Sequence, residues 1–218
     1  MLKTRIAVFV SGGGTNLQAL IDAQAAGIIS SGEIALVVAS RADAYALERA
    51  KNAGIPAAVA SKKELGSQQA VEARLNQLLA EHDIDMIVLA GYLSILSADF
   101  TKRWDKRIIN VHPSLIPAFC GEGMYGLKVH EAALNYGVKV SGATVHYVNE
   151  IADGGEIILQ KAVRICKTDT PQKLQKRIMK QAEWKILPAA AELVAARLAA
   201  EKAVKAAEPQ LKAKYKLQ

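Results

Sequence analysis

Cysteine is scarce in this chain of 218 residues, which contains only Cys120 and Cys166. Two cysteines are too few for the disulfide framework of a small secreted domain or for a zinc site built from cysteines. We therefore interpret both as ordinary thiols, and their small number agrees with a reducing cytosol.

Long hydrophobic runs are also missing. No stretch approaches the ~18 uninterrupted apolar residues of a membrane span. The chain starts with basic residues and an apolar run of about five residues before the glycines, against the ~7–15 residues of a signal-peptide core. We expect neither a membrane-spanning segment nor export, and we predict a cytoplasmic protein.

Acidic residues are in deficit, because 28 lysines and arginines face 21 aspartates and glutamates and the net charge is +7. The basic residues are scattered and are not interleaved with aromatic residues, so the pattern does not indicate nucleic-acid binding. A small anionic substrate explains the basic balance equally well. Much of the excess lies in the lysine-rich end, residues 198–218, which we interpret as a solvated, dispensable tail behind a single domain of residues 1–197.

Strand-like and helix-like segments alternate along the chain. Residues 5–10 form an apolar run typical of a buried strand, and apolar residues at helical spacing follow until Gly27. This order recurs, which predicts right-handed crossovers and a mostly parallel, Rossmann-like α/β sheet with helices on both faces. Longer, alternating strands are expected within residues 139–149 and 156–165, and a helix within 170–204 that breaks near Pro188.

The glycine-rich segment SGGGTN, residues 11–16, follows the first predicted strand. A dinucleotide-binding pattern needs a third glycine where Leu17 stands, and no lysine follows to make a Walker loop. Glycines let a ligand come close to the backbone, and N–H groups at a helix start, with Thr15 and Asn16, suit one phosphate. The alternative is a plain tight turn between strand and helix.

The segment RIINVHPSLIP, residues 107–117, places an amide and an imidazole at a strand end. Side chains two apart in a strand point to the same face, so Asn110 and His112 lie side by side. A site and a structural pair are equally good interpretations of this segment alone. His146 is likewise open between a structural and a functional role, and Asp153, before two glycines, is by itself a turn-forming aspartate.

Five segments occur in a fixed order along the chain: SGGGTNLQA, VLAGYLSIL, NVHPSLIPAF, GATVHYV and DGGEIILQ. This set resembles the glycinamide ribonucleotide transformylases, folate-dependent enzymes of purine synthesis, from about residue 4 to about residue 195. The Asn-x-His-Pro-Ser-Leu element and the later Asp-Gly-Gly element in one chain are specific to the resemblance.

The resemblance implies direct formyl transfer from 10-formyltetrahydrofolate to the primary amine of glycinamide ribonucleotide, without a metal or a covalent enzyme intermediate. Negative charge then develops on the formyl oxygen, which Asn110 and His112 stabilise as preorganised donors. Asp153 matches the third catalytic residue of the family. The resemblance implies that it favours a charged His112 and helps to move a proton from the attacking amine to the departing folate nitrogen.

The same resemblance implies the ligand contacts. It assigns the phosphate and the ribose to two segments that are far apart in the sequence, and the folate to the loop after the fourth predicted strand. The phosphate and ribose residues are Gly14, Thr15, Asn16, Lys180 and Glu183, with Lys180 and Glu183 one helical turn apart on one face, and the folate residues are Tyr92, Leu93, Ser94, Ile95, Leu96 and Asn110.

Some features depart from the family pattern. Many members carry arginine where Ser94 stands and near Gln68, which bears on how the folate glutamate tail is held. The glycine-containing segment 118–127 is longer than in some members and suggests a mobile flap over the site.

Three other functions compete with this interpretation. Formyltetrahydrofolate deformylase shares the fold and the catalytic pair, but it usually begins with a regulatory domain and does not need a phosphate loop. Methionyl-tRNA formyltransferase carries a further RNA-binding domain, and a non-catalytic nucleotide-binding module needs none of Asn110, His112 and Asp153. Oligomeric state is not indicated by the sequence.

Overall fold

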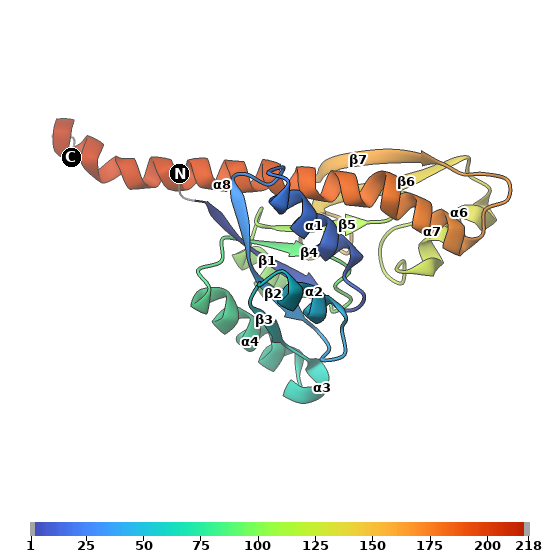
Figure 1. The fold of residues 1–218 in the computed structure, drawn as a ribbon, viewed down its shortest axis with the longest axis horizontal. Coiled ribbons are helices and arrows are strands. Elements are labelled where there is room, and N and C mark those ends of the chain that lie inside the picture. Colours follow the sequence, from blue (N-terminus) through green and yellow to red (C-terminus); the bar gives the residue numbers. More distant parts are fainter. Residues whose placement is uncertain (1–2, 216–218) are drawn as a thin grey trace.

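The computed structural model describes residues 3–215. They form a single seven-stranded sheet in the order β3-β2-β1-β4-β5-β6-β7, with helices on both faces (Figure 1). The predicted single-domain, Rossmann-like α/β fold is confirmed. The strands are β1 (Thr4–Val10), β2 (Gly32–Ala39), β3 (Ala57–Val59), β4 (Met86–Leu89), β5 (Ile108–His112), β6 (Val140–Tyr147) and β7 (Ile157–Arg164).

The sheet changes direction after its fifth strand. Strands β1 to β5 all pair in parallel, whereas β6 runs antiparallel to β5 and β7 runs antiparallel to β6. Strand β1 lies between β2 and β4, so the chain winds outward from β1 in both directions. In an open sheet of this kind, ligands bind beyond the carboxyl ends of the strands at such a switch point.

The helices cover both faces because residues along each strand point alternately to opposite sides. In β1, Ile6 and Val8 pack with residues of α1 and α8, and Ala7 and Phe9 pack with residues of α4 and α5. The helices are α1 (Thr15–Ala25), α2 (Ala46–Asn52), α3 (Lys62–Leu65), α4 (Gln68–Glu81), α5 (Ala98–Arg103), α6 (Leu127–Tyr136), α7 (Pro171–Ile178) and α8 (Trp184–Tyr215).

The prediction that the last helical segment breaks near Pro188 is wrong. Helix α8 continues through Pro188, and the irregularity lies one turn earlier, where Met179–Glu183 forms a π-helical turn between α7 and α8. Proline cannot donate to the carbonyl four residues before it, here that of Trp184. The missing bond at Pro188 does not end α8, and the π-helical turn is a separate irregularity that precedes this helix.

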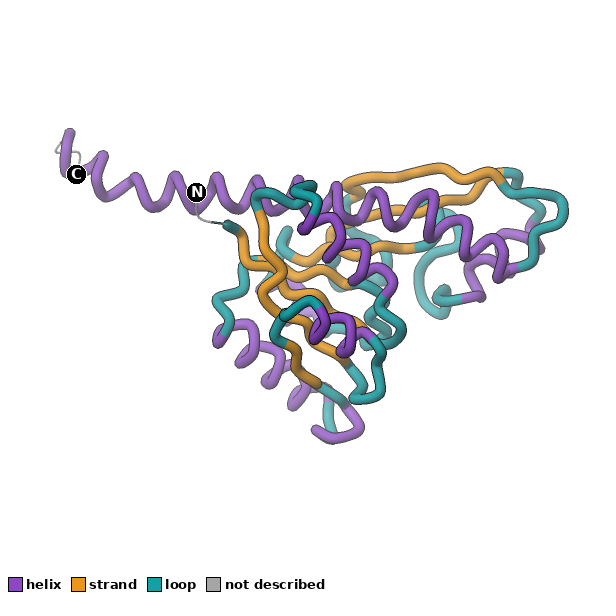
Figure 2. The backbone as a smooth tube through the Cα atoms, in the orientation of Figure 1, coloured by secondary structure: helices purple, strands orange, loops and turns teal. Residues whose placement is uncertain are grey.

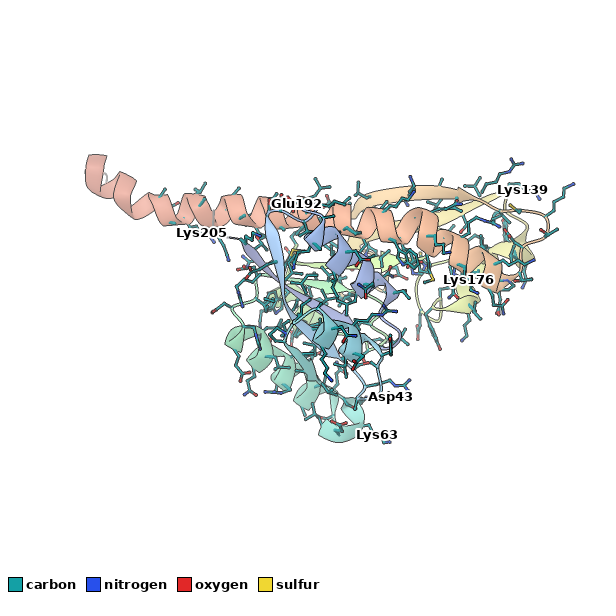
Figure 3. The ribbon with its side chains drawn as sticks, viewed as in Figure 1. Asp43, Lys63, Lys139, Lys176, Glu192 and Lys205 are labelled. Carbon is teal, nitrogen blue, oxygen red and sulfur yellow. The ribbon has the colours of Figure 1, made fainter. Side chains whose placement is uncertain are left out.

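Helix α8 leaves the body of the protein and projects beyond the sheet (Figures 1 and 2). Glu192 ties it to the body by accepting hydrogen bonds from Ser30 and Ser31, and Figure 3 places Lys205 further out along the same helix. No helix within residues 3–215 has both the length and the apolar character needed to cross a bilayer.

The predicted boundary between residues 197 and 198 falls inside this continuous helix. Leu198 is buried in the core, and Lys202 forms an ion pair with Asp85. The Lys202 side chain is 35% exposed and that of Asp85 is 15% exposed, so this pair is partly shielded from solvent. The dispensable tail therefore stays a prediction, and we expect it to apply to the part of the helix beyond Lys202.

Candidate functional site

The end of β5 brings the predicted amide and imidazole together at the carboxyl edge of the parallel strands. Asn110 and His112 lie two residues apart in β5, as the sequence predicted. Because β6 pairs antiparallel to β5, His146 stands opposite Asn110 and Thr144 stands opposite His112. Two segments more than thirty residues apart therefore contribute side chains to one cluster.

Asp153 reaches this cluster from the loop between β6 and β7. Its backbone lies in the left-handed region, with φ of 54°. Its carboxylate lies 3.3 Å from Nδ1 of His112 and 3.5 Å from Nε2 of His146, and it accepts a hydrogen bond of 2.9 Å from the N–H of Gly121. The structure thus joins Asn110, His112 and Asp153, the three residues predicted to be catalytic.

His146 is a member of the cluster that the sequence left undecided. Its Nδ1 lies 2.8 Å from the carbonyl oxygen of Tyr147, and its Nε2 lies 3.2 Å from Nδ2 of Asn110. The contact with Asn110 engages one side of its amide and leaves the other N–H available. In the sequence, the only indication of this position was that Thr144 and His146 alternate along one strand and so point to the same face.

His112 is buried between two acceptors. Its Nε2 lies 2.9 Å from the carbonyl oxygen of Phe119, and its Nδ1 faces Asp153. Burial lowers the pKa of His112 below its ordinary value, while the Asp153 carboxylate and the Phe119 carbonyl act to raise it. Asp153 thus favours the charged ring as predicted, but desolvation is the larger effect on this pKa.

The carboxylate of Asp153 stays ionised. Burial acts to raise the pKa of Asp153, but hydrogen bonds from His146 and from the N–H of Gly121, with the charge on His112, outweigh burial and hold the pKa below its ordinary value. Phe119 and Gly121 both belong to the predicted flap segment, so this segment contacts the cluster directly. Phe119 has a φ of 52°, a conformation that is uncommon for a residue with a bulky side chain.

The glycine loop lies at the carboxyl end of β1. Gly14 has a φ of 69°, and a Cβ there would lie 2.7 Å from Cβ of Ala46, so only glycine fits. A Cβ on Gly12 or Gly13 would meet no atom within 4 Å, so this backbone is open to a ligand. The loop therefore presents accessible backbone beside the start of α1, as expected of an anion-binding turn.

Asn16 and Glu183 meet beside this loop, although they are 167 residues apart in the chain. Nδ2 of Asn16 donates a hydrogen bond of 2.7 Å to Oε2 of Glu183. Oδ1 of Asn16 is buried without a partner among the described residues. Burial raises the pKa of Glu183, and the hydrogen bond from Asn16 offsets part of that rise. A buried carboxyl with an unpartnered amide oxygen is suited to the hydroxyl groups of a ligand.

The predicted alignment of Lys180 and Glu183 on one helical face is wrong. Both residues lie in the π-helical turn, whose turns are wider than those of an α-helix, so a spacing of three does not bring side chains onto one face. Glu183 is 6% exposed, whereas Lys180 lies on the surface. Any shared role of the two depends on how a ligand spans them.

The loop after β4 carries exposed apolar side chains at the same edge of the sheet. Leu93 is 65% exposed and Ile95 is 83% exposed, whereas Leu96 is buried. The N–H of Leu93 donates to Oγ of Ser11, and Nε2 of Gln68 donates a hydrogen bond of 2.8 Å to the carbonyl oxygen of Ile95. The loop is therefore fixed from both sides while it offers an apolar surface.

Two further residues of this loop complete the placement of the predicted folate residues. Tyr92 packs on Phe9 with ring centroids 5.3 Å apart, and burial raises the pKa of its hydroxyl. Ser94 follows on the same loop and is partly buried. Gln68, the other departure from the family pattern noted in the sequence, supports the backbone of the loop through its hydrogen bond to Ile95.

His130 on α6 is buried, and neither of its ring nitrogens has a hydrogen-bond partner among the described residues. Burial lowers its pKa to about 4, and the charge on His112 adds to this effect. The unfolded chain takes up a proton near pH 6.5 but the folded chain does not until about pH 4, so stability is lost as the pH falls through this range.

We expect a measurable acid sensitivity from this residue. The free energy of unfolding from urea titrations should fall between pH 7 and pH 5, and about 2 kcal/mol of that fall should be missing in His130→Leu. His82→Gln, at the end of α4, serves as the control and should keep the full drop. Equal drops in wild type and His130→Leu would show that His130 does not carry this dependence.

No group of three or more histidine, cysteine, aspartate and glutamate side chains within the described part of the chain is arranged to hold a metal ion. The cluster of two histidines, one asparagine and one aspartate instead offers hydrogen-bond donors beside an ionised carboxylate. Such a set is suited to stabilising a developing oxyanion and to moving a proton.

Comparison with known proteins identifies the family of this fold and site. A model of the formyl transferase family matches residues 4–191. The chain belongs to the formyl transferase family. The match covers all of the site residues described above, from the glycine loop to Glu183.

Members with known names agree with this assignment. Over 184 residues the chain is 42% identical to a phosphoribosylglycinamide formyltransferase of Haemophilus influenzae, covering 84% of each protein. It is 43% identical over 193 residues to the human trifunctional purine biosynthetic protein adenosine-3, covering 88% of this chain but 18% of that protein. The chain therefore spans about a fifth of such trifunctional relatives.

Solved structures of family members show the same fold. Glycinamide ribonucleotide transformylase 1 from Symbiobacterium toebii has a TM-score of 0.82 and 42% identity, with 88% of each chain covered. The enzyme of the same name from Geobacillus kaustophilus has a TM-score of 0.82 and 36% identity, covering 89% of this chain and all of that one. The predicted fold and the predicted transferase family are confirmed.

Proposed function

We propose that this formyl transferase carries the formyl group of 10-formyltetrahydrofolate to the primary amine of glycinamide ribonucleotide, a step of purine biosynthesis. The observation that carries the proposal is the convergence of Asn110, His112 and Asp153, with His112 Nδ1 and the Asp153 carboxylate 3.3 Å apart. The names of relatives such as the phosphoribosylglycinamide formyltransferase of Haemophilus influenzae support the same acceptor.

In the proposed reaction the amine nitrogen attacks the formyl carbon. A carbon–nitrogen bond forms, and the electron pair of the carbonyl bond moves to the oxygen, where the free N–H of Asn110 and an N–H of His112 stabilise it. The bond to the folate nitrogen then breaks. Asp153, ionised and next to His112, assists the transfer of the proton from the amine to that nitrogen, directly or through water.

One contact must change before His112 can act in this way. Its Nε2 faces the carbonyl oxygen of Phe119 at 2.9 Å, and its Nδ1 faces Asp153, so no ring nitrogen is left for the formyl oxygen. Phe119 lies in the flap segment, in an uncommon backbone conformation. A small shift of this segment on substrate binding would free Nε2.

The ribonucleotide is assigned to the other side of the site. The open backbone of the glycine loop, with Gly14, Thr15 and Asn16, suits the phosphate, and the surface ammonium group of Lys180 adds a positive charge. Asn16 and Glu183 suit the ribose hydroxyls. Binding of this remote part of the substrate orients the amine toward the formyl carbon.

The folate is assigned to the loop after β4. The exposed side chains of Leu93 and Ile95 supply an apolar surface for its ring, with Tyr92, Ser94 and Leu96 in the same loop. Both small molecules are thus co-substrates, and neither nucleic acid nor membrane is assigned a role. The cytoplasmic location stays a prediction, since a relative in Arabidopsis thaliana is chloroplastic.

The decisive experiment separates transfer from hydrolysis. A transferase excludes water from the formyl carbon until the amine arrives, because attack by water would waste the folate. We therefore expect 10-formyltetrahydrofolate to be nearly stable with the enzyme alone, and turnover to start when glycinamide ribonucleotide is added, with the formyl group recovered on the amine. Formate released at a comparable rate without the ribonucleotide would show that the protein is a deformylase and not a transferase.

Lys180→Ala tests the assignment of the phosphate. The variant should bind glycinamide ribonucleotide more weakly, about tenfold for one lost charge contact, and with a smaller dependence on salt, while folate affinity stays unchanged. Calorimetric titration of each ligand measures this, and Lys139→Ala, an exposed lysine before β6, is the control. A loss of folate affinity instead would mean that the two ligands have been placed the wrong way round.

A further inference from the structure

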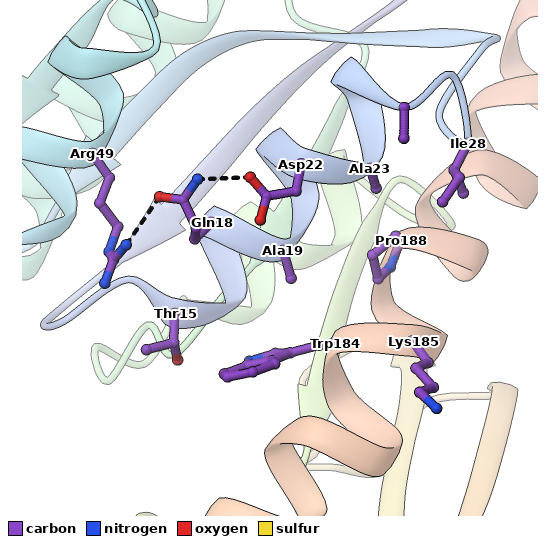
Figure 4. Close-up of a pocket in the computed structure, with 11 residues that line it drawn as sticks. Thr15, Gln18, Ala19, Asp22, Ala23, Ile28, Arg49, Trp184, Lys185 and Pro188 are labelled. Atoms are coloured by element: carbon purple, nitrogen blue, oxygen red, sulfur yellow. Dashed lines mark hydrogen bonds between the residues drawn. The ribbon is translucent and has the colours of Figure 1, made fainter.

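A cavity of about 620 Å³ lies between α1 and the beginning of α8 (Figure 4). Its volume is within the ~300–1,000 Å³ typical of small-molecule sites. Its walls contain none of Asn110, His112 and Asp153, so it is separate from the catalytic cluster. It is called the α1–α8 groove below.

The α1–α8 groove has the shape of a slot. Ala19 and Ala23 on α1 and Ala26 just after it lie about one turn apart and leave a smooth wall, because their side chains are small. The indole of Trp184 and the ring of Pro188 lie across from them on α8, and Figure 4 shows the indole extending toward Thr15 and Ala19. A planar ring fits between such walls and stacks on the indole.

The charged groups of the groove favour an anion. Arg49 and Lys185 both line it, and neither has a carboxylate within 4.0 Å in the described part of the chain. Arg49 donates to the carbonyl oxygen of Gly13 and to Gln18. The carboxylate of Asp22 also lines the groove, but it already accepts a hydrogen bond of 2.8 Å from Gln18. The two cationic side chains therefore outnumber the one carboxylate of the groove.

The groove shares a wall with the proposed ribonucleotide site. Thr15 and Trp184 line it, and their neighbours in the chain, Asn16 and Glu183, are joined by the hydrogen bond of 2.7 Å. Trp184 also follows directly on the π-helical turn that carries Glu183. A ligand that moves Trp184 or Thr15 therefore acts on the contact between Asn16 and Glu183.

We propose that the α1–α8 groove binds a planar aromatic anion, with its ring stacked on Trp184 and its charge near Lys185 or Arg49, and that its occupancy changes the affinity for the ribonucleotide. The second half rests on the proposed function, whereas the binding does not. Coupling of this kind is reciprocal, so the ribonucleotide changes the affinity of the groove by the same factor.

Binding is measured in the variant Trp104→Phe, because the chain has two tryptophans and this change leaves Trp184 as the reporter. The probe is adenosine 5′-monophosphate, with adenosine as the ring without the charge and inorganic phosphate as the charge without the ring. We expect saturable quenching of Trp184 by the monophosphate, and affinity about tenfold higher than for either fragment. The absence of saturable quenching, or equal binding of inorganic phosphate alone, would overturn the site.

Two matched pairs of variants locate the ligand. Ala19→Met fills the slot and should weaken the probe by at least about tenfold, whereas Ala25→Met, on α1 but outside the groove, should not. Lys185→Gln should weaken the monophosphate but not adenosine, and Lys176→Gln, on α7 and outside the groove (Figure 3), should change neither. Full affinity in Ala19→Met would place the probe elsewhere and overturn the proposal.

The coupling is read from the KM for glycinamide ribonucleotide with and without the probe. We expect the KM to shift in wild type and to stay constant in Ala19→Met. An unchanged KM with proven quenching would overturn the coupling and leave the site standing. If the protein transfers no formyl group under any condition, the proposed function fails, while the quenching experiment still decides whether the groove binds its ligand.

Discussion

Alanine at position 110 or 112 should lower kcat by about 10²–10³, the usual cost of losing one oxyanion donor, while the KM for both substrates changes little. Asn110 and His112 stand side by side at the end of β5, and His146 fixes the orientation of the Asn110 amide. Their N–H groups contribute most when charge develops on the formyl oxygen. Steady-state kinetics with both substrates varied measures this split between kcat and KM.

The control for both variants is Asn135→Ala, which removes an exposed amide from α6 and should leave the kinetics unchanged. Thermal unfolding of each variant excludes a loss of folded protein as the cause. Near-normal kcat in Asn110→Ala and His112→Ala would remove both residues from the proposed mechanism. A raised KM with unchanged kcat would show instead that they bind the ground state.

Asp153→Asn should lower kcat by about 10²-fold or more, the range for loss of a group that moves a proton. Asparagine keeps the size of the side chain and an oxygen for the N–H of Gly121, but it removes the negative charge beside His112. Because that charge acts to raise the pKa of His112, its removal lowers this pKa further. Any acid limb of kcat/KM that belongs to His112 should therefore move to lower pH in the variant.

The pH profile separates a chemical role of Asp153 from a structural one. A loop that is merely displaced would reduce the rate without moving the acid limb. Asp99→Asn, on the exposed side of α5, is the matched control and should keep both the rate and the profile. An Asp153→Asn enzyme with normal kcat would exclude the carboxylate from proton transfer.

The sequence predicted much of the candidate site because two of its parts are local. Asn110 and His112 alternate within one strand, and SGGGTN lies within one strand-to-helix turn, so each follows from the geometry of a single element. Asp153, Lys180 and Glu183 were assigned only through the family resemblance, since no local pattern connects them to the other residues. The structure joins Asp153 to His112, and Glu183 to Asn16.

Other features required the pairing of distant segments. His146 meets Asn110 only because β6 runs antiparallel to β5 in one particular register. Phe119 covers His112 from the flap segment, and Gln68 supports the loop that carries Ile95. Nothing in the spacing of these residues along the chain indicates such contacts.

By itself, the sequence determined the alternation of strands and helices, the buried strands and the position of the glycine turn, since hydrophobic periodicity and glycine act within a few residues. Only the tertiary structure decided which strand ends face one another, that Glu183 is buried while Lys180 is exposed, and that α8 continues through Pro188. These outcomes depend on strand order and helix packing. They are set by packing over the whole core. This packing outweighs a single local preference, such as the tendency of Pro188 to end a helix.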